Sequence, residues 1–394
     1  TESGYTLKKG TFDISKGNDP TTAAYVNFGH IITEKNGSDE GVIKVSKGVA
    51  AYGVNGSKII NKGTIEVTNS DSTNSGIAIM ALTKTEGKAE TYGIAANKAA
   101  AGSKWIEIEN KGTIKIGNGT PAENAIGIYA KNNHSDAATR NLSTIKNEKP
   151  IELGDNSKAI VFQVKDGIKE GGTITLKDSG TSQDIKVGKN GIGVYGEYSD
   201  INLATDYGIA IKDDGVAIQT KGTGKIDAAG KTLNVELGKN STFGLLNGNK
   251  STTASPLLSK YLNNGTTDKI NITSFGEGAS IFYATLKANA ILDTDYTVTN
   301  GGADSTSVLV ANDGANVEIA SGKTLTTNTN VGLIATGGAR VSGAVSVAEN
   351  KGNLISTRVD KGIGIYVTYG TGKNSGTITM NNKNAVGMLA TIGS

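Results

Sequence analysis

The sequence predicts an all-β chain wound into a parallel β-helix (β-solenoid), and three observations support this fold class. Glycine accounts for 54 of the 394 residues, about twice its usual share, whereas proline occurs only 4 times. Short apolar segments alternate with polar residues at a period of two, which indicates strands. Two short phrases also recur along the chain, which is typical of proteins built from stacked repeats.

The first recurring phrase is Gly-Thr, a β-branched residue, and then alternating polar and apolar residues. In the copy that begins at Gly63, Ile65 and Val67 form one apolar face, which predicts a half-buried strand. Asparagine precedes several copies. The copies begin at Gly63, Gly112, Gly172 and Gly376, with looser versions at Gly41 and Gly322. Because their spacing is variable, the coils should have a constant shape and be joined by loops of different lengths.

The second phrase places glycine or alanine between larger apolar residues, as in Ile126-Gly127-Ile128-Tyr129. The small residue either lets another surface approach closely or marks a bend of the coil. Further copies lie at 76–81, 192–195, 208–211, 215–218, 331–335, 363–366 and 386–390. The two phrases alternate along much of the chain, as strands on different sides of one coil would.

These patterns predict coils of two or three short strands whose branched aliphatic side chains stack inside the solenoid. Asparagine and glycine are expected at the corners, where positive φ is common. With about 20 to 25 residues per coil, the chain would form roughly 16 to 20 coils. An antiparallel sandwich or propeller is the alternative, but neither requires two phrases in alternation. We divide the chain into a cap or first coils (1–35), β-helix (36–246), an inserted loop with a short helix (247–268) and further β-helix (269–394).

Composition excludes several classes of function. The chain has no cysteine, so it contains no disulfide, thiolate metal site or cysteine nucleophile. A net charge of +3 spread over this length does not suggest binding to nucleic acid. No run of 18 apolar residues is present, so we expect no membrane-spanning helix.

The repeats resemble those in the passenger domains of large type Va autotransporter adhesins of the fusobacterial style. The resemblance is carried by Asn-Lys-Gly-Thr-Ile at 61–65 and 110–114, by 125–130, and by the final stretch 374–390. It implies a right-handed β-helix at the cell surface, outside the outer membrane, that binds a receptor on a host cell or partner bacterium. It also implies that this chain is an excised passenger segment, and that the full-length parent is anchored by a C-terminal membrane barrel.

Stretches that interrupt the repeat are candidate binding elements, because solenoids usually carry specificity on loops. In 247–268, Ser255 and Pro256 predict the start of a short helix on which Lys260 and Tyr261 are candidate contacts. The alternative is a helix that covers the solenoid or joins two segments.

The two other candidate elements are the loop 131–150 and the stretch 83–104 with the tryptophan that follows it. The loop offers His134 and Arg140 to a glycan or protein, unless it is only a solvated insertion. Trp105 could stack on a sugar or form an interface hot spot, or it could point inward from its strand.

The sequence shows no arrangement typical of catalysis. The two histidines, His30 and His134, accompany no Gly-x-Ser-x-Gly, His-Glu-x-x-His or Walker motif. We therefore expect no catalytic, metal or cofactor site, and we expect the chain to act by binding.

The competing hypotheses are a β-helical polysaccharide lyase or hydrolase and a purely structural stalk. For the enzyme, paired carboxylates would be Asp213 with Asp214 or Asp293 with Asp295, although the first pair is also typical of a polar turn.

Overall fold

The computed structural model describes residues 3–14, 21–27, 29–68, 76–83, 105–117, 123–133, 143–169, 171–178, 183–222, 224, 226–227, 230–248, 269–337 and 344–391. These residues contain strands and turns and no helix, so the predicted all-β class is confirmed. They form two compact units, Thr1–Ile209 and Ala210–Ser394. The predicted helix within 247–268 lies almost wholly outside the described residues.

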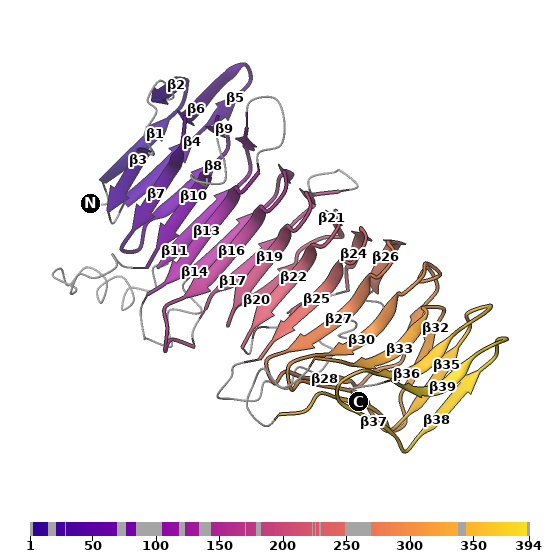
Figure 1. Cartoon of the computed structure of the whole chain (residues 1–394). Helices are drawn as coiled ribbons and strands as arrows, with labels where there is room; N and C mark the ends of the chain where they lie inside the picture. Colours follow the sequence, from indigo (N-terminus) through magenta and orange to yellow (C-terminus); the bar gives the residue numbers. More distant parts are fainter. Residues whose placement is uncertain are drawn as a thin grey trace. The chain divides into compact units, whose positions relative to one another are not determined.

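In the first unit, parallel strands from successive coils line up into sheets (Figure 1). The first sheet contains β3 (Thr21–Asn27), β7 (Gly48–Val54), β10 (Ile77–Leu82), β13 (Ile126–Asn132), β16 (Lys158–Val164) and β19 (Ile192–Glu197). The second sheet contains β1 (Ser3–Leu7), β4 (Gly29–Thr33), β8 (Lys58–Asn61), β11 (Ile106–Asn110), β14 (Ser143–Asn147), β17 (Thr173–Leu176) and β20 (Asp200–Leu203).

Two shorter groups of strands complete the first unit. One contains β2 (Gly10–Ile14), β6 (Asp39–Val45), β9 (Thr64–Val67) and β12 (Thr113–Ile116), and the other contains β15 (Ile151–Leu153), β18 (Ile185–Val187) and β21 (Tyr207–Ile211). The short strand β5 (Lys35–Asn36) pairs antiparallel with β6, whereas the pairings between coils are parallel. The N-terminal segment thus supplies strands that pair directly with later coils.

The second unit has the same design. Its largest sheet contains β22 (Val216–Lys221), β25 (Thr242–Asn247), β27 (Ser280–Thr285), β30 (Ser307–Ala311), β33 (Val331–Ala335), β36 (Ile363–Val367) and β39 (Val386–Ala390). Its other strands are β23 (Ile226–Asp227), β24 (Thr232–Leu237), β26 (Lys269–Phe275), β28 (Asn289–Leu292), β29 (Tyr296–Val298), β31 (Asn316–Ile319), β32 (Thr324–Thr327), β34 (Val347–Asn350), β35 (Asn353–Ser356), β37 (Thr371–Asn374) and β38 (Thr377–Met380).

Most coils are longer than the sequence led us to expect. The positions that pair between neighbouring strands show this, because one coil of chain separates them. Val49 pairs with Ile77, and Ile77 pairs with Ile126, so the second of these coils is at least about twice as long as predicted. Shorter coils that agree with the expectation also occur, as between Ile363 and Val386 in the second unit. The prediction was too short for most coils because turns and insertions between the strands add to each one.

An aliphatic ladder forms the core of the first unit. On the second sheet, six isoleucines from six successive strands pair in register, and each is 1 % exposed or less. They are Ile31, Ile59, Ile108, Ile145, Ile174 and Ile201. Full burial stabilises each such side chain by about 1.5–3 kcal/mol. A single coil could not obtain this burial by itself, so stability depends on stacking.

The asparagines that precede the first phrase form a second, polar ladder in the interior. Asn61 Nδ2 donates to Asn110 Oδ1 at 2.8 Å, and Asn110 Nδ2 donates to Asn147 Oδ1 at 2.8 Å. Thr33 donates to Asn61 at one end, and Asn147 donates to the Tyr207 hydroxyl at the other. Burial raises the pKa of Tyr207, so its phenol stays protonated. Buried amides in this ladder therefore have partners in the coils above and below.

Glycine is required in the first phrase because the coils approach closely there. A Cβ added at Gly63 would collide with the carbonyl oxygen of Gly41, and one added at Gly112 would collide with that of Gly63. At the corners, Asn156 and Asn190 have φ of 55° and 53°, which confirms the predicted use of asparagine at positive φ. The copy at Gly172 differs from those at 63 and 112, because its strand lies in the second sheet.

Replacing Asn110 by alanine should destabilise the protein by about 1–3 kcal/mol, because Asn147 Oδ1 would lose its donor in the interior. Urea unfolding followed by circular dichroism measures this change. The control is Asn271→Ala, which removes an exposed amide bond to Asn234 and should change stability by less than about 0.5 kcal/mol. Equal effects of the two substitutions would contradict a stabilising role of the buried ladder.

Glu148 should make stability fall in acid. Its side chain is 14 % exposed and lies 2.7 Å from Lys146 Nζ and 3.0 Å from Lys177 Nζ. Burial opposes ionisation, but the bonds from both lysines outweigh it and lower the Glu148 pKa. These ion pairs therefore stabilise the fold above the ordinary glutamate pKa of about 4.3, and their contribution is lost as the pH falls through the folded-state pKa.

Glu148→Gln should accordingly cost about 1 kcal/mol at pH 7 and much less at pH 3. The measurement is urea unfolding of both proteins at the two pH values. Glu277→Gln, which affects an exposed pair with Lys239, is the control and should change stability little at either pH. A cost of Glu148→Gln that is the same at pH 3 and pH 7 would argue against this assignment.

Candidate binding face

Most of the predicted contact residues lie outside the described residues. This holds for Lys260 and Tyr261 in the 247–268 insertion and for His134 and Arg140, so these contacts stay predictions. The predicted 131–150 loop was drawn too wide, because 131–132 belong to β13 and 143–147 form β14. Trp105 is described, and its side chain is only 1 % exposed. The structure therefore places Trp105 in the core just before β11, and its predicted role as a surface contact is wrong. The physical reason is that Trp105 lies at a bend just before the strand, so that it and the following Ile106 are both buried.

Three of the carboxylates considered for catalysis, Asp213, Asp214 and Asp295, accept hydrogen bonds from a neighbouring coil. Asp213 and Asp214 form a turn, as the sequence indicated, and Asp214 has φ of 57°. Asp213 Oδ1 accepts from the Lys239 backbone N–H at 2.8 Å, and Asp214 Oδ1 accepts from Asn240 Nδ2 at 3.1 Å. Asp295 likewise accepts from the Thr324 N–H. Among the described residues, no group of three or more His, Cys, Asp or Glu side chains could hold a metal ion.

The outward side of the first sheet of the first unit carries an apolar column. Figure 1 shows its six strands side by side. On β13, Ile128 and Ala130 are fully buried, whereas Tyr129 between them is partly exposed, so Tyr129 faces outward. The residues in register with Tyr129 on the other strands are Tyr25, Tyr52, Met80, Val161 and Tyr195, of which Val161 is only 2 % exposed.

A second outward column runs beside this one. It contains Val49, Ile77, Ile126, Lys158 and Ile192, which also pair in register. We call the two columns together the tyrosine face. Between them lie small buried residues such as Gly127 and Gly193, where two successive residues face inward. A Cβ at Gly127 would lie 2.6 Å from the carbonyl oxygen of Ala159 on the next strand, so the small residue lets the neighbouring coil approach closely.

The tyrosines of this face are held in place by their neighbours. Tyr25 and Tyr52 meet edge to face, with ring centroids 5.4 Å apart. The Tyr129 hydroxyl donates to Gln163 Oε1 at 2.9 Å. Burial, with a smaller contribution from Glu197, raises the pKa of Tyr195, so this hydroxyl remains a donor at neutral pH. Ordered aromatic rings with polar tips lose little conformational entropy on binding and are favoured at interfaces.

The sequence contained a signal for this face that we did not use. Tyrosine stands at the same place of the second phrase in Ile126-Gly127-Ile128-Tyr129 and Ile192-Gly193-Val194-Tyr195. Residues at equivalent places of a repeat stack in a solenoid, so the recurrence predicts a column. In the second unit the matching column holds Leu245, Tyr283, Val310, Ile334, Tyr366 and Leu389. There the neighbouring column includes hydroxyls, with Thr242 and Ser280 hydrogen-bonded at 2.9 Å.

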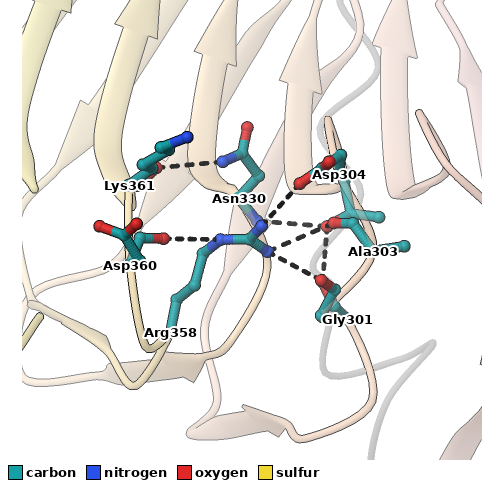
Figure 2. A network of polar contacts seen from close by, with 9 residues as sticks. Gly301, Ala303, Asp304, Asn330, Arg358, Asp360 and Lys361 are labelled. Carbon is teal, nitrogen blue, oxygen red and sulfur yellow. Dashed lines mark hydrogen bonds and ion pairs between the residues drawn. The ribbon is translucent and has the colours of Figure 1, made fainter. Parts of the chain in front are cut away.

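A network of polar contacts around Arg358, which we call the arginine clasp, lies in the second unit (Figure 2). Arg358 Nη1 donates to the carbonyl oxygens of Gly302 and Ala303, and Nη2 contacts Asp304 Oδ1 at 3.0 Å. Its Nε donates to the Asp360 carbonyl oxygen. The guanidinium thus joins turns that belong to different coils and are far apart in the sequence.

The contacts of the arginine clasp hold parts of the chain together and leave few donors of Arg358 for a ligand. The Arg358 side chain is only 13 % exposed, and its donors are directed at backbone carbonyls. A pocket of about 250 Å³ beside it is lined by Gly302, Asn328, Thr357, Arg358, Val359 and Asp360. The one signal for Arg358 in the sequence is its rarity, since the chain contains only three arginines among 40 basic residues. An arginine in a chain that otherwise uses lysine indicates a site that needs a planar, multidentate donor.

No protein-family model, curated protein or solved structure matches this chain in the comparisons. Within the described residues, no helix is long and apolar enough to cross a membrane.

Arg358→Lys should destabilise the protein by about 1.5–3 kcal/mol, since a lysine cannot reproduce the fork of donors to separate carbonyls. Asp304→Ala is the matched control. It removes only the exposed ion pair, because the Asp304 side chain is 84 % exposed, and should cost less than about 1 kcal/mol. Chemical denaturation measures both. If Arg358→Lys costs no more than Asp304→Ala, the backbone contacts of the clasp are unimportant for stability.

Proposed function

We propose that this chain is a passenger segment of a cell-surface adhesin and that it binds a receptor on a host cell or partner bacterium. The observation that carries the proposal is the tyrosine face, because an ordered aromatic and aliphatic surface on a regular scaffold is suited to binding. The resemblance of the repeats to autotransporter passengers supports the location at the outer surface of the outer membrane. In this proposal the protein acts by binding and not by catalysis.

The proposed mechanism rests on stiffness. Each coil is held to the next by backbone hydrogen bonds and by the aliphatic ladder, so residues on the sheet surface have little freedom to move relative to one another. A ligand that contacts several strands therefore binds a surface that is already ordered, and loses less of its binding free energy to reorganisation. The predicted loops 131–150 and 247–268 would add further receptor contacts.

Replacing Tyr129 and Tyr195 together by alanine should weaken attachment of the purified chain to receptor-bearing cells by about 10- to 100-fold, because truncating an aromatic anchor typically costs more than 1 kcal/mol. Attachment is measured as a binding curve of labelled protein on cells, with circular dichroism and melting used to verify the fold. The matched control is Tyr366→Ala, which removes a tyrosine from the same place of the phrase in the second unit.

Two outcomes would count against this function. Attachment that is unchanged in the double variant but lost on deletion of 134–142 and 249–268, which leaves the strands β13, β14 and β25 intact, would move the binding site to the loops. A chain that attaches to no cell type, whatever its sequence at 129 and 195, would instead favour the structural stalk.

A further inference from the structure

We propose that the tyrosine face binds a linear, extended, β-1,4-linked glycan that carries acidic groups, with the glycan lying along the stacking direction of the coils. This inference rests on the proposed function and names the chemistry of its ligand. Three properties of the face lead to it: the spacing of its tyrosines, the sign of its charges and its narrow shape.

The spacing is the first property. Tyr52, Tyr129 and Tyr195 lie on alternate strands β7, β13 and β19, and smaller side chains, Met80 and Val161, stand between them. Since neighbouring strands are about 4.8 Å apart, the three rings recur at roughly 9.6 Å. That distance is close to the length of one disaccharide in an extended β-1,4-linked chain. Successive sugars of such a chain are turned over relative to each other, so the same sugar face returns at every second ring and could stack on each tyrosine.

The charge is the second property. The six strands of this sheet carry three charged residues, Lys131, Lys158 and Glu197. Glu197 is only 5 % exposed, and its carboxylate accepts from the Val164 N–H. The charge presented by the sheet is therefore positive, with Lys158 in register between Ile126 and Ile192. Carboxylate or sulfate groups on the glycan would complement these lysines.

The shape is the third property and argues against a folded protein as the ligand. One column on six strands and one on five make a strip roughly 25 Å long and 10 Å wide. Its area of about 250 Å² is well below the roughly 800 Å² per partner of a standard protein interface. The strip also lies on the surface of a sheet and not at its edge, so it offers no backbone groups for pairing with an added strand. A single polysaccharide chain fits this strip.

The test uses oligomers of β-1,4-linked D-mannuronate, from the dimer to the octamer, as acidic probes, and cello-oligosaccharides of the same lengths as neutral probes. Isothermal titration calorimetry at low salt measures binding to the whole chain. The affinity for mannuronate should rise with length and level off near the pentamer or hexamer, the length that reaches from Tyr52 to Tyr195. Cello-oligosaccharides should bind more weakly.

Substitutions separate the two contributions. Tyr129→Ala should weaken binding of both probes by about 10-fold. The double substitution Lys131→Gln and Lys158→Gln should weaken mannuronate binding about fivefold more than it weakens cellohexaose binding. The matched control Tyr366→Ala should affect neither probe. Equal affinity for the acidic and neutral hexamers would overturn the acidic part of the proposal.

Failure of this inference can be distinguished from failure of the proposed function. If neither probe binds while cell attachment still depends on Tyr129 and Tyr195, the face is a binding site but its ligand is not an extended glycan. Sedimentation velocity adds one more overturning outcome, a dimer that dissociates in the Tyr129→Ala variant, which would assign the face to a second copy of the chain. If attachment itself does not depend on these tyrosines, the binding function of the face is wrong.

Discussion

The stacking of one coil on the next is the constraint on which the rest of the structure depends. No coil can bury its own branched side chains, but six isoleucines from consecutive strands of the second sheet exclude water when they stand in register. Parallel backbone hydrogen bonds fix the same register. Because both interactions need every coil to superimpose on its neighbour, variation in length is confined to the turns and loops between strands.

This constraint also governs the polar groups of the interior. A side chain at a given place of one coil meets its equivalents directly above and below, so an asparagine needs an asparagine or a hydroxyl next to it. The ladder from Thr33 through Asn147 to Tyr207 meets this requirement through side chains, and Asn61 and Asn147 also donate to backbone carbonyl oxygens. At the corners, carboxylate and amide side chains bond to the turn of the next coil, as Asp155 does to the Lys189 N–H. In the second unit, the longer Arg358 side chain likewise bonds to the backbone of a turn in another coil.

The same stacking arranges the side chains of the outer surface in columns. A residue type repeated in the sequence at one place of a phrase becomes a column in space, whether it faces the core or the solvent. The core needs such columns for stability, but the outside does not. The outward column of tyrosines and aliphatic residues is held by contacts between its own members and leaves tyrosine rings partly exposed, which is why it supports the proposed role in binding. Its regular spacing is imposed by the backbone.

The sequence by itself determined the fold class, since alternation at a period of two, glycine at close approaches and asparagine at corners are local requirements of each coil. It did not indicate that Asn61 and Asn110 form a buried ladder, because we expected asparagine at the corners and these two lie within strands. Only the tertiary structure decided which outward residues stand together, because the variable loops hide the register between distant copies of a phrase. That register brings Tyr129 beside strands from other coils and turns Trp105 inward. It likewise carries Arg358 to the carbonyl oxygens of a turn in a distant coil, a contact that no local pattern specifies.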